Sequence, residues 1–229
     1  RGLGDVYKRQ EFTYRMLKDT VDMPRTRGYL DPYCREAFRK YARHSSVAEI
    51  AADIQKEFAL PVVVKPNQGT KGRNVCLCRK EAEIQRAVKR IFDKKSRFYD
   101  FVAVAQEYFQ PEMEYRVILL GEEILLAYAK DIRSARCKGN ISPLHWEGAK
   151  AVPVADRSLI SRFENFLQPV HRILTLEFSG VDIIRDQEDR LWLLEINSQP
   201  DFELFIRDNG PAEIIGAYKK VLLNLKKRN

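Results

Sequence analysis

The spacing of apolar residues along the chain predicts where its helices lie. In residues 46–58 and 80–92 apolar residues recur every three or four positions, which is the period of an amphipathic helix. The first segment begins with Ser46 and carries Glu49 three residues later, the pattern of a capping box. The residues of the second segment predicted to face inward are Ile84, Val88 and Ile91. Further helices are predicted at residues 12–19, 156–176 and 211–227.

Shorter apolar runs bounded by turn residues predict the strands. The runs are residues 61–66, 73–78, 101–109, 114–120, 123–130, 178–186 and 191–200. Gly121 and Glu122 alone separate two of them, which predicts a tight hairpin. Residues 131–150 form a polar stretch without a period, and a segment of that length in a compact domain is more often a functional loop than an accident. Strands mixed with helices, in several hairpins, predict an α+β fold with antiparallel sheet.

The composition is that of an ordinary globular protein with a basic excess. Of 229 residues, 45% are apolar and 31% are charged, and the formal net charge is +8. The first ten residues hold +2 of this charge and residues 226–228 hold +3. We recognise no basic stripe interleaved with aromatic residues, so the charge favours anionic small molecules over nucleic acid as partners.

The sequence also indicates where the protein acts. No apolar run approaches the roughly 18 residues of a membrane span, so no membrane partner is expected. The cysteines, which form no C-x-x-C pair, are interpreted as reduced thiols of a cytoplasmic protein. They are Cys34, Cys76, Cys78 and Cys137.

The opening segment RGLGDVYKRQ, residues 1–10, fits nothing that follows it. It lacks an initial Met, shows no period and looks like sequence read through from a sequencing adapter. We interpret it as a leader outside the fold. The alternative is a genuine irregular arm that packs Leu3, Val6 and Tyr7 against the core.

The stretch VVVKPNQGTKGRNVCLC, residues 62–78, places a lysine in an apolar strand beside a glycine loop. A buried ammonium group is costly unless an anion offsets it, so Lys65 suggests an anionic ligand. Gly69 and Gly72 lie in the turn between two strands, where backbone N–H groups can close over phosphates. The alternative is an ordinary turn beside a strand.

Acidic residues gather in the predicted hairpin at residues 181–197. Glu195 and Asn197 lie two positions apart on one strand and so share a face. If the turn spans residues 187–188, Asp182 pairs with Leu193 and lies on the same face, whereas a three-residue turn would break this parity. Carboxylate and amide oxygens suit a hard divalent cation. The alternative is a set of solvated acids.

Six segments join these features in a known order: PVVVKPNQGTKGRNV, VAQEYF, EMEYRVILLGEEILLAYAK, KGNI, GVDIIRD and LLEINSQP. From Phe12 onward the chain resembles the ATP-grasp superfamily of carboxylate–amine ligases. Within it the chain is most similar to glutamate ligases that modify ribosomal protein tails, followed by glutathione and cyanophycin synthetases. The resemblance implies an α+β fold of two subdomains that grip ATP, residues 11–110 with a glycine-rich lid and residues 111–229 with a metal-binding hairpin.

The resemblance also implies roles for individual residues. The nucleotide contacts are Lys65 for the α-phosphate and adenine, the lid Gln68, Gly69, Thr70, Lys71 and Gly72 for the β- and γ-phosphates, Glu107, Tyr108 and Phe109 for the adenine, and Glu114 for the ribose. The groups near the transferred phosphate and the substrate are Lys130, Arg116 and Asn140. The metal ligands are Asp182, Glu195 and Asn197, for two Mg²⁺ ions that Mn²⁺ could replace. Singly, these residues could equally be a strand end, a solvated lysine or a cross-strand ion pair.

The activity implied is ATP-dependent, ADP-forming ligation of a carboxylate to an amine, with small molecules, a peptide or a protein tail as substrates and a homo-oligomer as a further expectation. Two departures from the family stand out: the position of an upstream Lys falls in the suspect junction KRQE, so this nucleotide contact is expected to be lost, and Asp201 replaces a Gly. The small α/β domain that precedes the core in relatives is not in this sequence. An ATP-binding module without catalysis and a basic RNA- or ribosome-associated protein therefore stay as alternatives.

Overall fold

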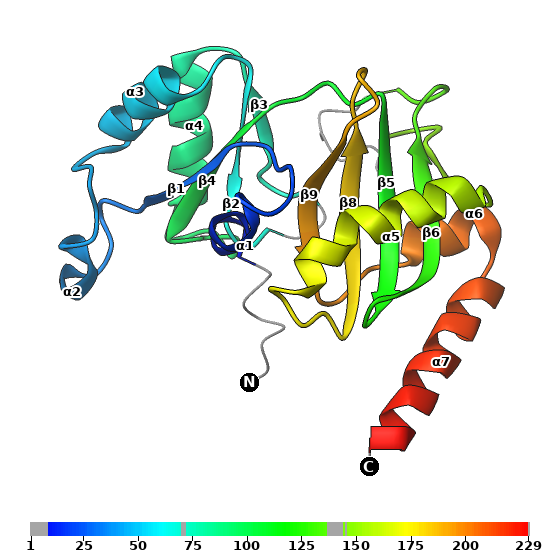
Figure 1. Cartoon of the computed structure of the whole chain (residues 1–229). Coiled ribbons are helices and arrows are strands. Elements are labelled where there is room, and N and C mark those ends of the chain that lie inside the picture. The colour runs from blue at the N-terminus through cyan, green and yellow to red at the C-terminus, as the bar shows by residue number, and fades with distance from the viewer. Residues whose placement is uncertain (1–8, 70–71, 137–143, 145, 229) are drawn as a thin grey trace.

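The computed structural model describes residues 9–69, 72–136, 144 and 146–228. Within these residues the chain forms two antiparallel sheets, each with its own helices (Figure 1). All strands of the first sheet precede residue 111 and all strands of the second follow it. The predicted α+β class with antiparallel sheets is confirmed.

The first sheet has four strands in the order β1-β4-β2-β3. They are β1 (Thr26–Leu30), β2 (Val62–Pro66), β3 (Cys76–Cys78) and β4 (Val102–Glu107). Helices α3 (Val47–Glu57) and α4 (Glu81–Ile91) cover one face and share a core with Val62 and Val64. Because side chains alternate along a strand, Val63 and Lys65 point to the opposite face. The short helix α2 (Glu36–Arg39) follows β1.

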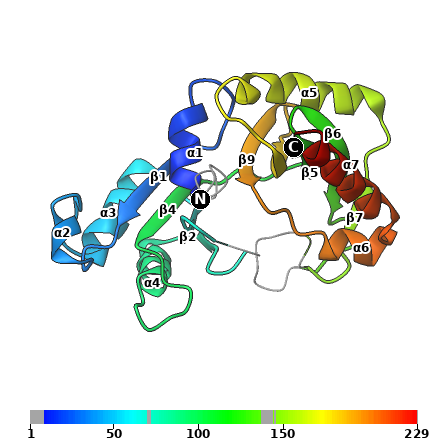
Figure 2. The same cartoon turned by 90° about the horizontal axis from the view of Figure 1, so that it is seen from below.

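The second sheet has five strands in the order β7-β6-β5-β8-β9. They are β5 (Met113–Leu120), β6 (Glu123–Asp131), β7 (Lys150–Pro153), β8 (Phe178–Arg185) and β9 (Leu191–Asn197). Helix α5 (Arg157–His171) packs on one face through Phe163 and Leu167. Helices α6 (Glu203–Asn209) and α7 (Ala212–Arg228) lie on the opposite side (Figure 2), where Phe205 and Ile214 join a separate core cluster.

Helix α1 (Gln10–Leu17) connects the two sheets although it comes first in the chain. Both views place it between them, and it contacts β1 and β9 (Figures 1 and 2). Leu17 and Val21 belong to the core of the second sheet. The leader boundary expected at residue 11 falls inside this helix, since Gln10 is already helical; residues 1–8 lie outside the described part of the chain.

Side-chain caps explain where two predicted helices begin. Ser46 Oγ accepts a hydrogen bond from the Glu49 backbone N–H at 3.2 Å, as the capping box predicts. The return bond is shifted by one residue, because the Glu49 carboxylate accepts from the backbone of Ser45. Asp156 caps α5 by accepting from the N–H of Ser158 at 2.8 Å.

The sequence did not predict four of the elements, namely β1, α2, β7 and α6. β1 contains Arg27 and Gly28 and therefore carries no apolar run. Helix α5 ends at His171, five residues before the predicted end, soon after Pro169, whose ring removes a helical hydrogen bond.

Two expectations about location can be compared with the structure. Within the described residues, none of the helices combines the length and apolar character needed to cross a bilayer. Cys34, Cys76 and Cys78 are free thiols, as expected, and Cys137 lies outside the described residues.

Candidate nucleotide site between the two sheets

One face of the second sheet carries a row of polar side chains that the strand register aligns. Tyr128, Arg116, Asp182 and Glu195 lie side by side on four neighbouring strands. In the next row towards the beginning of β5, Glu114 is followed by Ile184 on β8. In the row on the other side, Gly180 pairs with Asn197. Directly paired residues of antiparallel strands share a face, so the sheet itself gathers these groups.

Four charged side chains on this face form a cluster, which we call the charged cluster: Glu114, Lys130 and Asp182, which are buried, and Arg116, which is half-buried. Arg116 donates two hydrogen bonds to the carboxylate of Asp182, at 2.7 and 2.6 Å. Lys130 lies 3.2 Å from the same carboxylate and also donates to Glu114. Two cations thus match two anions, which is the condition for burying charge without a prohibitive loss of hydration.

The charged cluster shifts the pKa values of its members. Burial alone would raise the pKa of Asp182, but Arg116 and Lys130 lower it to about 2. Burial opposes the charge of Lys130, yet Asp182 and Glu114 hold its pKa above the usual value. Burial raises the pKa of Glu114, although Lys130 beside it opposes the rise. Asp182 and Lys130 therefore stay charged at neutral pH.

Lys65 approaches this cluster from the first sheet. It is only 7% exposed and donates to Gln106 Oε1 at 2.6 Å. Gln106 in turn donates to Thr26 Oγ1 at 2.9 Å, which fixes the orientation of the amide. Burial lowers the pKa of Lys65 to about 8, although Glu195, Glu114 and Asp182 oppose the fall. The buried lysine inferred from the sequence is therefore observed, and the three carboxylates that oppose the fall of its pKa lie on the other sheet.

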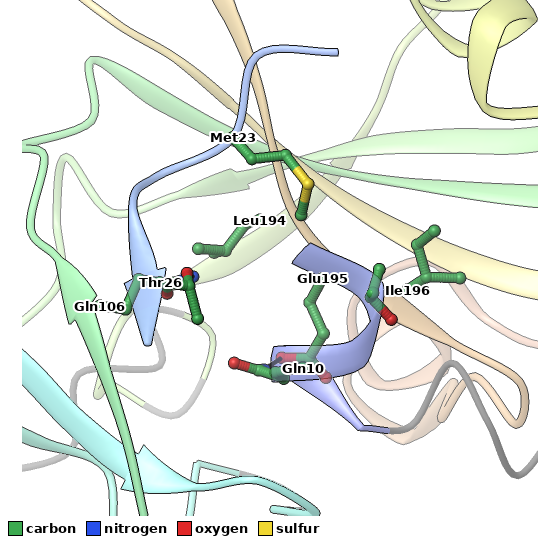
Figure 3. Close-up of a pocket in the computed structure, with 8 residues that line it drawn as sticks. Gln10, Met23, Thr26, Gln106, Leu194, Glu195 and Ile196 are labelled. Carbon is green, nitrogen blue, oxygen red and sulfur yellow. Dashed lines mark hydrogen bonds between the residues drawn. The ribbon is translucent and has the colours of Figure 1, made fainter. Parts of the chain in front are cut away.

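Glu195 lies at the junction of the two sheets. Figure 3 shows it in a small pocket with Gln10 of α1, Thr26 and Gln106 of the first sheet, and Met23, which lies on the segment that connects α1 to β1. Gln10 Nε2 donates to Glu195 Oε2 at 2.9 Å, a contact between residues 185 positions apart in the chain. Helix α1 thus covers one side of the space between the sheets.

The hairpin of β8 and β9 reaches the predicted geometry through a different register. Ile183 pairs with Leu193, so the predicted pairing of Asp182 with Leu193 is wrong. A β-bulge between Asp182 and Ile183 shifts the register by one residue and brings Asp182 opposite Glu195. The longer turn would have placed the two carboxylates on different faces, and the bulge restores them to one.

The glycine loop differs from the charged cluster in being open. Gln68 and Gly69 are exposed, and the backbone N–H of Gln68 donates to Asp100 Oδ2 at 2.7 Å. Gly72 has a φ of +66°, a conformation that favours glycine. A Cβ at Gly69 would meet only Pro66, at 3.8 Å, so the fold does not itself demand glycine there. Thr70, Lys71 and Asn140, predicted as site residues, lie outside the described residues.

The segment predicted to frame the adenine joins the two sheets. Glu107 ends β4, and its carboxylate accepts from the backbone N–H of Arg25 at 3.2 Å. Phe109 packs on Trp192 of β9, with ring centroids 4.5 Å apart. Tyr108 lies between them and is half-buried. The segment therefore has contacts on both sheets.

The predicted metal ligands lie close together, but Asp182 is already bound by two cations. Asp182 and Glu195 are direct neighbours and Asn197 follows on the same face. Elsewhere in the described chain, as here, no three His, Cys, Asp or Glu side chains are placed to share a metal ion. Carboxylate and amide oxygens are the ligands that suit a hard divalent cation. Because Asp182 is paired with Arg116 and Lys130, such an ion would be held mainly by Glu195, Asn197 and oxygens of a bound ligand.

Sequence reasoning missed three residues of this site. Gln106 was visible as a polar residue in an apolar strand, and its contact with Lys65 could have been suspected. Gln10 had been assigned to the leader, and Thr26 lies on the strand that was not predicted. Their roles depend on tertiary contacts that no local pattern reports.

Two antiparallel sheets that face each other over buried cations and carboxylates define the ATP-grasp fold. Among solved structures, the chain is similar to D-alanine–D-alanine ligase from Bacillus anthracis complexed with ATP, with a TM-score of 0.63 and 14% identity over 97% of this chain and 68% of that one. It is also similar to the biotin carboxylase domain of 2-oxoglutarate carboxylase from Hydrogenobacter thermophilus, solved with MgADP, with a TM-score of 0.57 and 17% identity over 87% and 41% of the two chains.

The chain belongs to the RimK-like ATP-grasp family, whose domain matches residues 40–217. It is 24% identical over 160 residues to the alpha-aminoadipate–LysW ligase LysX of Sulfolobus acidocaldarius, covering 70% of this chain and 55% of LysX. It is 26% identical over 146 residues to a probable alpha-L-glutamate ligase of Azotobacter vinelandii, covering 62% and 44%. The chain thus spans about half the length of the curated relatives it matches, and the resemblance drawn from its six motifs is confirmed.

Proposed function

We propose that this chain forms the nucleotide-binding part of an ATP-dependent, ADP-forming carboxylate–amine ligase. The observation that carries the proposal is the meeting of Lys65 from the first sheet with the charged cluster of the second. Lys65 and Lys130 are buried and Arg116 is half-buried, and a polyanion could engage all three by taking the place of the carboxylates that pair with Arg116 and Lys130. Membership of the RimK-like family and ligase relatives support the same reading.

The reaction requires positioning and charge neutralisation rather than a nucleophilic side chain. A substrate carboxylate would take the γ-phosphoryl group of ATP, giving an acyl-phosphate and ADP. An amine would then attack the acyl carbon, form the amide bond and release phosphate. In this scheme Lys65 holds the α-phosphate, Lys130 exchanges Glu114 for the terminal phosphates, and Arg116 stabilises the oxyanion that forms during attack. Glu114 then turns to the ribose.

The glycine loop would act as the lid. The fold would accept a Cβ at Gly69, so glycine is not required there for packing. The absence of a side chain instead leaves space above the backbone of the loop. A phosphate approaching the backbone N–H groups would use that room. We assign Gln68, Gly69 and Gly72 to this lid, together with Thr70 and Lys71, and Glu107, Tyr108 and Phe109 to the adenine.

Magnesium bound with ATP would neutralise phosphate charge and help align the γ-phosphate. We assign Asp182, Glu195 and Asn197 to two such ions, and Mn²⁺ has the same ligand preference. Charge supports the assignment, because Glu195 lies beside Asp182 and accepts a hydrogen bond from the neutral amide of Gln10, so its charge is available to a cation. A bound cation would also explain why two acids, Asp182 and Glu195, lie next to a site proposed for the phosphates of ATP.

The substrates are an amino acid or peptide carboxylate and an amine, which a protein tail could supply. LysX is a ligase for α-aminoadipate and the protein LysW, and this precedent supports a protein acceptor. Specificity would lie in the 131–150 loop, with Asn140, and in the region that precedes this domain in relatives. We place the reaction in the cytoplasm, in keeping with the free thiols, and expect a homo-oligomer.

ADP release tests the proposal directly. The protein is incubated with ATP, Mg²⁺ and panels of amino acids as carboxylate and amine donors, and ADP is measured by a coupled assay. We expect release that requires Mg²⁺ and both donors and that falls at least a hundredfold in Arg116→Met. If the protein binds MgATP but releases no ADP with any pair of donors, its function is nucleotide binding without ligation. If it does not bind MgATP, the proposed function is wrong.

A further inference from the structure

A second surface, distant from the charged cluster, gathers exposed aromatic side chains. Helix α2 has no buried residue, and both views place it at the edge of the molecule away from the five-stranded sheet (Figures 1 and 2). Tyr33, Phe38 and Tyr41, on or beside this helix, are 52%, 53% and 65% exposed. We call residues 33–43 the aromatic arm. Singly exposed apolar residues need no explanation, whereas a group of them marks a candidate interaction surface.

The aromatic arm is fixed to the rest of the first sheet's domain by contacts at both of its ends. At one end the buried Asp31 accepts hydrogen bonds from the backbone N–H of Tyr33 at 2.8 Å and from the hydroxyl of Tyr99 at 3.0 Å. At the other end His44 Nε2 lies 3.4 Å from Asp53 of α3. Between these anchors Cys34 is buried, whereas Tyr33, Phe38 and Tyr41 are exposed.

The aromatic arm is also strongly basic. It carries four exposed cations, Arg35, Arg39, Lys40 and Arg43, against the single acid Glu36. None of the four forms an ion pair within the part of the chain that the structure describes. The ammonium group of Lys40 lies 5.1 Å from the ring centroid of Tyr41. A fifth cation, Lys94, reaches across from the loop after α4 and donates to the backbone carbonyl of Tyr33.

We propose that the aromatic arm binds single-stranded nucleic acid. Cations beside it neutralise phosphates, and exposed rings stack on unpaired bases, a combination that tolerates any sequence. A duplex hides the faces of its bases from such rings, and an acidic polypeptide would use the cations but leave the rings without a stacking partner. The interleaving is present in the segment YCREAFRKYAR, although the sequence reading did not recognise it as a basic stripe.

The proposal goes beyond ligation and does not depend on it. Binding is measured by fluorescence anisotropy with labelled oligouridylate and oligothymidylate dodecamers, which distinguish RNA from DNA. We expect both or one of them to bind, with an affinity that falls as salt rises. An RNA duplex and a polyglutamate peptide of the same length serve as competing ligands, and both are expected to bind more weakly.

Two pairs of substitutions separate stacking from charge. Phe38→Ala/Tyr41→Ala should weaken binding about tenfold or more at every salt concentration, because two stacking surfaces are lost. Arg39→Ala/Lys40→Ala should lower the slope of log Kd against log salt by about 1.4, since each contacted phosphate of a single strand contributes about 0.7.

Matched controls lie on α7, far from the aromatic arm in Figure 1. Leu222→Ala/Leu225→Ala removes two exposed apolar residues, and Lys219→Ala/Lys226→Ala removes two exposed cations. Neither control should change binding, and MgATP affinity should be the same in all four variants. Tighter binding of polyglutamate than of the oligonucleotides, binding that survives in both arm variants, or loss of self-association in Phe38→Ala/Tyr41→Ala without any oligonucleotide binding would each overturn the proposal.

Discussion

Replacing Lys65 with Met should stabilise the protein while it abolishes nucleotide binding. Lys65 is 7% exposed, and burial lowers its pKa from 10.5 to about 8 despite the nearby carboxylates. At about 1.4 kcal/mol per pKa unit, holding this charge inside the fold costs roughly 3 kcal/mol. Met fills similar space without charge but leaves Gln106 without its hydrogen bond, a loss of about 1 kcal/mol. The net gain expected at pH 7 is about 2 kcal/mol.

The pH dependence of this gain follows from the same two pKa values. Below pH 8 Lys65 is charged in both the folded and the unfolded chain, so the full cost is present. Between about pH 8 and 10.5 the unfolded chain holds the proton more tightly, and the stability of the parent protein rises with pH through this group. The advantage of Lys65→Met should therefore shrink across this window.

Thermal melts at pH 7 and pH 10 measure both effects. A gain of about 2 kcal/mol corresponds to roughly 4–8 °C for a chain of this size. Comparing parent and variant at each pH cancels the titration of tyrosines and cysteines in the same range. A variant that melts below the parent at pH 7, or a difference that does not change with pH, would refute the reasoning. Retained MgATP binding by Lys65→Met would refute the assigned role.

Three further predictions concern the charged cluster and the lid. Asp182→Ala should cost about 3–5 kcal/mol in urea unfolding, because it removes the carboxylate that pairs with Arg116 and leaves Lys130 with Glu114 alone. Arg133→Ala, which breaks an exposed pair with Asp131, should cost less than about 1 kcal/mol. Equal costs would contradict the account. Since the pKa of Asp182 is about 2, its stabilisation should be present above about pH 4 and should disappear as pH falls towards 2, so the acid midpoint of unfolding should lie in this range and not near pH 6. Gly69→Ala should leave the melting temperature within about 2 °C, because the fold has room for the added Cβ. The same Cβ should weaken ATP binding, because it would occupy the space of a phosphate above the loop. Unchanged ATP affinity would show that Gly69 is not part of the lid.

Local sequence patterns predicted the elements that bury a periodic apolar face. The period of Ile84, Val88 and Ile91 predicted the inner face of α4, and Ser46 predicted the start of α3. β1 was missed because Arg27 and Gly28 interrupt its pattern, and its partner strand β4 supplies what the local sequence lacks. Strands without a periodic apolar pattern, such as β1, are therefore determined by pairing with a distant segment of the chain.

The contacts of the candidate site were harder to predict than its residues. Motif order led to Lys65, Asp182 and Glu195, and the strand register places Asp182 beside Glu195. The expected register was wrong, and only the bulge in the hairpin places Asp182 beside Glu195. The sequence also gave no sign that Asp182 is paired with Arg116, or that Gln10 of α1 closes over Glu195, since these contacts span 66 and 185 positions.

Calorimetric titration of MgATP tests the central claim most directly, because the claim is that nucleotide and metal meet between the two sheets at Glu195. Glu195→Gln keeps the shape of the side chain and its partner Gln10 but removes the charge. Glu188→Gln, at an exposed position of the same hairpin, is the matched control. We predict that Glu195→Gln loses at least tenfold in magnesium-dependent ATP affinity with an unchanged melting temperature, while Glu188→Gln binds like the parent. Equal ATP affinity in parent, control and Glu195→Gln would contradict the account.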